Sequence, residues 1–152
     1  MADAVVVTGL DELIERMQAF PVEMAKIGTL NMNASLAVLH ENVPPYADEP
    51  QNSSYDRTGT LGRTLGSSES GGASGGTPDI YTVRKLGGGN VEGKFGTRLD
   101  YAEKVIGDTT QAAIHRGRWW TMKTIYNAST KKIIQIWQNV ANALASFLDG
   151  KR

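Results

Sequence analysis

Residues that could bind a nucleotide phosphate occur in one stretch of the sequence, GGNVEGKF, from Gly88 to Phe95. Gly88, Gly93 and Lys94 match the spacing of a P-loop, in which backbone N–H groups and a lysine surround the phosphates. Phe95 stands where a P-loop needs a serine or threonine to bind Mg²⁺. The flanking residues also predict a strand on each side, so we interpret the stretch as the turn of a β-hairpin.

The histidines and serines give little support for catalysis or metal binding. His40 and Glu41 end a predicted helix without HExxH spacing, and the other histidine, His115, is far away in the sequence. No GxSxG nucleophile elbow occurs. The chain has no cysteine, which excludes disulfides, thiolate nucleophiles and cysteine-bound zinc. We therefore expect no enzymatic activity, no catalytic or metal-binding residues and no cofactor.

Arginines near aromatic residues could bind a nucleic acid, since guanidinium groups contact phosphates and aromatic rings stack on bases. However, 16 basic residues balance 16 acidic ones, so the chain lacks the overall positive field of a typical nucleic-acid-binding protein. We expect at most local contact with DNA. The arginines in question are Arg57, Arg63, Arg84, Arg98, Arg116 and Arg118.

Two long helices are predicted, one near each end of the chain. Apolar or small residues recur every three or four positions from Leu13 to Val38, which marks one face of a helix. Asp11 could cap its start, and Pro21 predicts either a kink or a tight restart. A second such stripe runs from Trp119 to Leu148 and predicts a helix of about 30 residues.

The middle of the chain predicts a loop and a hairpin. Residues 44–78 have little periodicity and include the tract GSSESGGASGG at 66–76, for which two interpretations stay open. The tract is either a flexible surface loop or a segment that becomes ordered against a neighbouring subunit. Residues 79–97 alternate in hydrophobicity around a glycine cluster, as in a β-hairpin. Residues 101–106 predict either a short strand or a helical turn.

Length and pattern together indicate the fold class. A chain of 152 residues with 40% hydrophobic content fits a single domain over 1–152. We expect an α+β fold, with long N-terminal and C-terminal helices packed on a small antiparallel β-sheet and a flexible loop at about 44–78. The N-terminus lacks the basic start of a signal peptide, and no segment reaches the roughly 20 apolar residues of a membrane span. We expect no membrane association.

The stretch QAAIHRGRWWT, Gln111–Thr121, places two tryptophans side by side. Neighbouring residues on a helix point about 100° apart, so both rings cannot lie on one buried stripe. Trp119 fits the stripe of the C-terminal helix. We therefore expect Trp120 to face a neighbouring subunit or the 44–78 loop, with packing on the chain's own hairpin as the alternative.

Two segments of the sequence, YADEPQNSSYDRTGTLGRTL at Tyr46–Leu65 and YAEKVIGDTTQAAIHRGRWWT at Tyr101–Thr121, resemble a family of small virion proteins of tailed bacteriophages. This is the tail-completion or head–tail joining (neck) family. The resemblance includes the order of a long helix, Pro44 and Pro45, the Arg57–Leu61 motif, a hairpin, Tyr101 and Ala102, the Gln111–Trp119 motif and a closing helix. It covers most of the chain.

The resemblance implies a structural protein without catalytic residues. Such proteins form rings, commonly of six copies, between the portal or connector and the tail tube, where they complete or terminate the tail. It also implies location in the neck or tail of the virion, assembly in the host bacterial cytoplasm, and genomic DNA passing through the channel without sequence-specific binding. Adaptor, stopper, tail-terminator and completion roles all remain open.

A subunit of a ring needs two interface surfaces, and tryptophan, tyrosine and arginine dominate such interfaces. The alternative is a monomeric α+β binding or regulatory protein whose 44–78 loop closes on a partner. For Arg57, Thr58 and Gly59, a structural turn and an interface are both open, with Gly59 in a conformation that other residues avoid. The residues expected at a subunit or partner interface are Tyr46, Arg57, Thr58, Gly59, Leu61, Arg63, Tyr101, Gln111, His115, Arg118 and Trp120.

Overall fold

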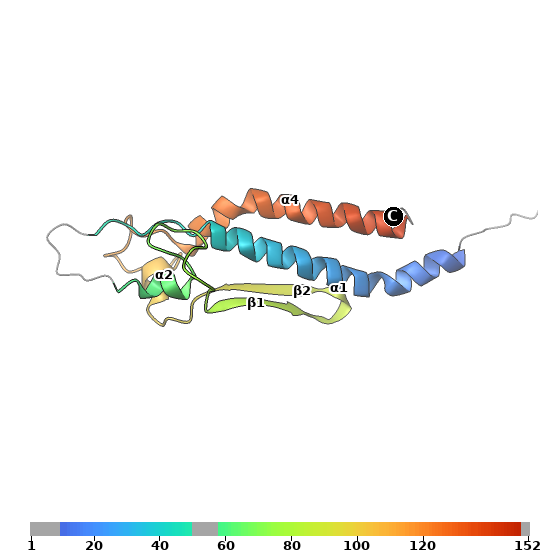
Figure 1. The fold of residues 1–152 in the computed structure, drawn as a ribbon, viewed down its shortest axis with the longest axis horizontal. Coiled ribbons are helices and arrows are strands. Elements are labelled where there is room, and N and C mark those ends of the chain that lie inside the picture. Colours follow the sequence, from blue (N-terminus) through green and yellow to red (C-terminus); the bar gives the residue numbers. More distant parts are fainter. Residues whose placement is uncertain (1–9, 50–57, 150–152) are drawn as a thin grey trace, which may run out of the picture.

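The central element of the protein is a long helix, α1 (Leu10–Glu41). The structure is a computed structural model that describes residues 10–49 and 58–149, with side chains from residue 14 onward. Pro21 lies inside α1, which continues as one helix and changes direction in its N-terminal, blue part (Figure 1). A kink is what a proline without a backbone N–H causes in a helix. Asp11, the predicted cap, lies within α1, and its side chain is outside the described ones.

One side of α1 packs on the predicted β-hairpin. Strands β1 (Ile80–Lys85) and β2 (Val91–Gly96) are antiparallel, with Ile80 opposite Gly96 and Lys85 opposite Val91. A short 3-10 turn, η1 (Gly87–Gly89), joins them. Glycine allows the helix to approach closely, because a Cβ atom at Gly93 would collide with the side chain of Met32 on α1.

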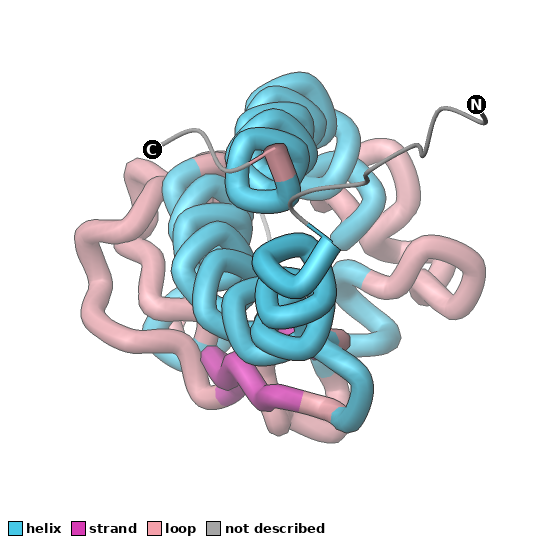
Figure 2. Tube along the Cα trace, turned by 90° about the vertical axis from the view of Figure 1, so that its right-hand side faces the viewer, coloured by secondary structure: helices cyan, strands magenta, loops and turns pink. Residues whose placement is uncertain are grey.

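A second long helix, α4 (Met122–Leu148), runs antiparallel to α1 on another side. Ile125 and Ser129 are fully buried in this contact, and the Ser129 hydroxyl donates to the carbonyl of Val38 at 3.4 Å. The molecule therefore has three layers, with α1 between α4 and the hairpin (Figure 1). Seen along the long axis, the strands lie at one side of the helices (Figure 2).

Two short helices close the end of the molecule where α1 finishes. These are α2 (Thr60–Thr64) and α3 (Ala102–Ile106), which settles the open choice at 101–106 in favour of a helical turn. Apolar residues of these two helices, together with Leu65 at the end of α2, form a buried cluster against which Met122 at the start of α4 packs. The cluster consists of Leu61, Leu65, Ala102, Val105 and Ile106.

The glycine- and serine-rich tract at 66–76 is bound to its own chain. The backbone N–H of Tyr46 donates to the carbonyl of Glu69 at 2.9 Å, and that of Gly72 donates to the carbonyl of Val43 at 2.8 Å. Ser67 is only 2% exposed. The tract thus lies against the segment that leaves α1, rather than standing away from the chain. Its many glycines permit positive φ angles, as at Gly66, and the tight turns that this path requires.

The structure confirms the α+β fold class, with two long helices and a small antiparallel sheet. The predicted start of the C-terminal helix at Trp119 was wrong, because α4 begins at Met122. Thr121 has an extended backbone, and its N–H donates to the hydroxyl of Thr124 in the first turn at 3.2 Å. Both tryptophans therefore precede the helix and do not share its apolar stripe.

Candidate interface at the aromatic end

Three aromatic rings lie together at the end of the molecule that carries α2 and α3. The rings of Tyr46 and Trp119 are 5.6 Å apart between centroids, and those of Trp119 and Trp120 are 6.1 Å apart. Both pairs are tilted, the arrangement that the ring quadrupole favours. Trp119 and Trp120 are both partly buried against the cluster of α2 and α3. Because both tryptophans precede α4, helical geometry does not hold their side chains about 100° apart, and both rings can pack against the same cluster.

The segment after α1 is attached to the tryptophan loop by two hydrogen bonds. The indole Nε1 of Trp120 donates to the carbonyl of Pro45 at 3.0 Å, and a guanidinium N–H of Arg118 donates to the carbonyl of Asp48 at 3.1 Å. Trp120 therefore contacts the 44–78 segment of its own chain, one of the two expected places.

Gln111 joins α3 to the tryptophan loop from inside. Its side-chain amide donates to the carbonyl of Val105 at 2.7 Å and to the carbonyl of Trp119 at 3.1 Å. The residue is 7% exposed. Arg116 closes the same loop by donating from Nε to the carbonyl of Gln111 at 3.0 Å. Gln111 thus shapes the aromatic end without presenting its own side chain to a partner.

Tyr46 is fixed between α2 and the tryptophans. Its hydroxyl donates to the carbonyl of Gly59 at 3.1 Å, and a Cβ atom at Gly62 would overlap the Tyr46 ring. Burial raises the pKa of the Tyr46 phenol above its usual value of 10.0, and the nearby Glu69 carboxylate raises it further. The phenol therefore stays protonated at neutral pH and remains a hydrogen-bond donor.

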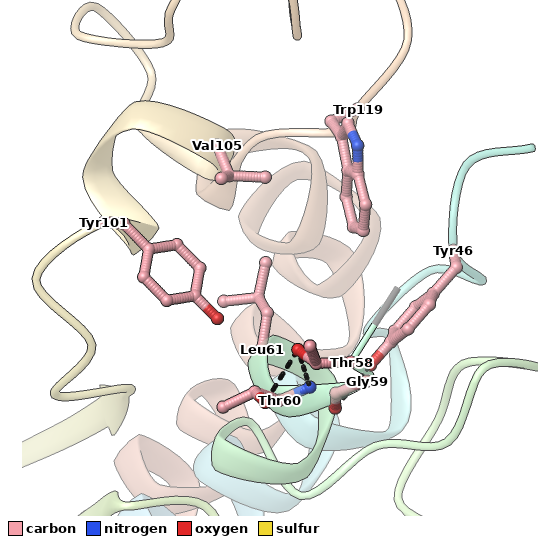
Figure 3. A pocket seen from close by; sticks show the side chains of 8 residues that line it. All are labelled: Tyr46, Thr58, Gly59, Thr60, Leu61, Tyr101, Val105 and Trp119. Atoms are coloured by element: carbon pink, nitrogen blue, oxygen red, sulfur yellow. Dashed lines mark hydrogen bonds between the residues drawn. The ribbon is translucent and has the colours of Figure 1, made fainter. Parts of the chain in front are cut away.

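Thr58 and Gly59 form the turn that leads into α2. Gly59 has a φ angle of 65°, as expected for a position that side-chain-bearing residues avoid. The hydroxyl of Thr58 lies 2.9 Å from that of Thr60 and accepts the Thr60 N–H at 3.4 Å (Figure 3). Arg63, one turn later, donates to the Thr60 hydroxyl at 3.1 Å. Arg57 lies outside the described residues.

A small hollow opens between these residues, with the rings of Tyr46 and Tyr101 on either side of Leu61 (Figure 3). Its volume of about 30 Å³ is close to that of one water molecule in the liquid. It is far below the roughly 300 Å³ at which ligand sites begin. It can hold the tip of one side chain but not a substrate. The lining residues are Tyr46, Thr58, Gly59, Thr60, Leu61, Tyr101, Val105 and Trp119.

The structure brings many of the predicted interface residues to this end. Five of them line the hollow: Tyr46, Thr58, Gly59, Leu61 and Tyr101. Arg63 lines an adjoining hollow of about 350 Å³, whereas Gln111, His115, Arg118 and Trp120 line neither. Tyr101 is 46% exposed, but Leu61 is only 7% exposed and belongs to the core. Thr60, Val105 and Trp119 were not predicted here, although the apolar spacing of Val105 with Ala102 is visible in the sequence.

His40, considered above only as a weak metal-ligand candidate, has a structural role. It is 9% exposed, and its Nε2 lies 2.7 Å from the carbonyl oxygen of Gly66. A carbonyl only accepts, so Nε2 carries the proton. The rings of Tyr81 and Phe95 lie 6.1 and 6.0 Å away. His40 therefore ties the glycine-rich tract to the end of α1.

Other kinds of site find little support in the described part of the chain. Within residues 10–49 and 58–149, no three histidine, aspartate or glutamate side chains come close enough together to hold a metal ion. No helix in those ranges contains an apolar stretch that would cross a bilayer. Comparisons with protein-family models, curated protein sequences and solved structures gave no match to the chain.

Proposed function

We propose that this chain is a structural subunit that assembles into a ring at the head–tail junction of a tailed bacteriophage. The observation that carries the proposal is the meeting of two distant sequence segments at one end of the molecule. Tyr46–Leu65 and Tyr101–Thr121, the segments of the family resemblance, share the aromatic cluster and its hollow. Residues from both segments, such as Tyr46 and Tyr101, thus line the same hollow.

The chemistry of this surface suits protein association. It combines a partly exposed tyrosine, Tyr101, with the exposed arginines Arg63 and Arg118, and such residues are enriched at the energetic centres of interfaces. The hollow is too small for a metabolite and fits a single side-chain tip. This hollow therefore suits a protruding side chain of a partner protein better than a small molecule.

Exposed apolar side chains on the long helices also support assembly. Val22 is 73% exposed and Leu30 is 64% exposed on α1, while Tyr126 and Ile134 are 60% and 51% exposed on α4. Isolated exposed apolar residues are common, but several on two helices of a thin, three-layered subunit favour burial by neighbours. The proposed partners are other copies of the chain, commonly six in all, together with portal or connector and tail-tube proteins.

Light scattering over a concentration series tests the proposal, with electron microscopy of the largest species. A closed oligomer with a central channel would support it. Tyr101→Ala should weaken the oligomer, whereas Leu86→Ala, 42% exposed at the hairpin end, provides a matched control. Equal loss of association in both variants would argue against the aromatic end as the interface.

The second candidate function is a monomeric binding protein whose 44–78 loop closes on a partner. Two backbone hydrogen bonds weigh against it, from Tyr46 to Glu69 and from Gly72 to Val43. They hold the glycine-rich part of this segment to the residues that follow α1. Two results would together favour this candidate over the ring. The protein would be a strict monomer at every concentration, and the loop would be protected from proteolysis only when a host extract is added.

A further inference from the structure

A second hollow lies on the flank of α1, between β2 and the start of α4. It has a volume of about 290 Å³, enough for a few side chains, and its lining is mainly apolar. Tyr126 borders it and is 60% exposed, so its ring is free to pack against a segment that enters the hollow. The apolar residues that define this flank groove are Leu36 and Leu39 of α1, Gly93 and Phe95 of β2, and Met122 and Tyr126 of α4.

The strand that borders the flank groove has an open edge. β2 pairs with β1 along one edge, and within the described residues no backbone hydrogen bond joins its other edge to another segment. An open edge presents a row of N–H and C=O groups that can pair with an added strand. Only β2 contributes to the groove, and β1 does not. The groove thus combines backbone pairing groups with an apolar floor, the two requirements of strand addition.

We propose that the N-terminal segment Met1–Gly9 of a second copy of this chain occupies the flank groove as a strand beside β2. This inference rests on the self-assembly proposed above. The segment reads MADAVVVTG and lies outside the described residues. Val5, Val6 and Val7 are β-branched, which favours a strand. In a strand, Val5 and Val7 point to one face and can reach the apolar floor, while Val6 points to the other.

Covalent geometry indicates why the segment must come from another copy. Leu10 and Leu36 are separated along α1 by about 39 Å, at a rise of about 1.5 Å per residue. Fully extended, the five residues Val5–Gly9 span at most about 18 Å. The chain's own valines, which lie closer to Leu10 than Met1 does, fall well short of the groove. Such head-to-tail donation is a heterologous contact and can close into a ring.

Disulfide mapping tests the proposal directly, since the chain has no cysteine of its own. Val6→Cys is prepared in one batch and Tyr126→Cys in another, and the two are mixed, equilibrated and oxidised. Any bond between positions 6 and 126 then joins different chains. Ile114→Cys is the matched control, because Ile114 is 70% exposed but does not line the groove. We expect severalfold more 6–126 than 6–114 disulfide by peptide mass spectrometry.

A charged double variant of the valine run tests the same contact without cross-linking. Val5→Asp combined with Val7→Asp should weaken self-association by on the order of tenfold or more per buried valine, while helical circular dichroism stays unchanged. Ala2→Asp, which adds a charge outside the valine run, should change it little. Equal association of both variants would overturn the proposal.

The outcomes also separate this inference from the proposed function. A wild-type oligomer whose 6–126 yield does not exceed the 6–114 yield would leave self-assembly in place and refute strand donation. A wild-type monomer at every concentration, with no 6–126 disulfide, would refute both. An oligomer with preferential 6–126 linkage would support both.

Discussion

Replacing Gln111 measures how strongly the aromatic end is held together from within. Its amide makes two hydrogen bonds, to the carbonyls of Val105 and Trp119. Val105 lies in the last turn of α3, where carbonyl groups lack helical donors. Gln111→Ala therefore leaves buried acceptors without their donor. A net hydrogen bond contributes about 1 kcal/mol, so we expect a loss of about 2 kcal/mol in the free energy of unfolding.

Urea unfolding followed by tryptophan fluorescence gives this free energy, at one fixed protein concentration because assembly adds to apparent stability. In a thermal scan the same loss lowers Tm by about 4–8 °C for a chain of this size. Gln138→Ala, at an exposed position on α4, is the control and should stay within about 0.5 kcal/mol of the wild type.

Gln111→Glu tests the direction in which the stability of the aromatic end changes with pH. The introduced carboxyl faces two carbonyl oxygens in a buried site, and both features raise its pKa above the usual value of about 4.3. A raised pKa favours the protonated form, so the variant is least destabilised below pH of about 4 and loses stability as pH rises through the raised pKa. A Gln111→Ala loss below about 0.5 kcal/mol, or no pH dependence for Gln111→Glu relative to the wild type, would refute the reasoning.

Three further predictions concern the same end of the molecule. Trp120→Ala removes the hydrogen bond to Pro45 and part of the interface, so the native mass should fall while circular dichroism keeps its helical signal; loss of that signal would contradict this. Gly62→Ala should displace the Tyr46 ring and destabilise the fold by about 1–3 kcal/mol by overpacking, whereas Gly87→Ala, with open space around it, should not. Because the pKa of Tyr46 is raised from 10.0, its contribution should persist below pH 10 and be lost as pH rises further, which alkaline unfolding with Tyr46→Phe as reference would check.

The sequence alone predicted the long elements correctly. Repeats of three and four residues identified α1 and α4, and alternation around glycines identified the β1–β2 hairpin, because these patterns follow from the local geometry of helices and strands. Pro21 predicted either a kink or a tight restart, and α1 continues through it as one helix. The positive φ of Gly59 followed from its place in a turn. The P-loop-like spacing was correctly interpreted as a hairpin turn.

Only the tertiary structure decided where side chains without local periodicity lie. Trp119 continues the apolar spacing of α4, but the hydrogen bonds around Thr121 start the helix later, and both tryptophans turn onto the cluster of α2 and α3. The inward role of Gln111 depends on α3 meeting the tryptophan loop, which no spacing encodes. The contacts of the glycine-rich tract with its own chain were not predicted, because its partners, such as Val43, come from a distant part of the sequence. Periodicity records contacts within an element, whereas these contacts join separate elements and exist only once the chain has folded.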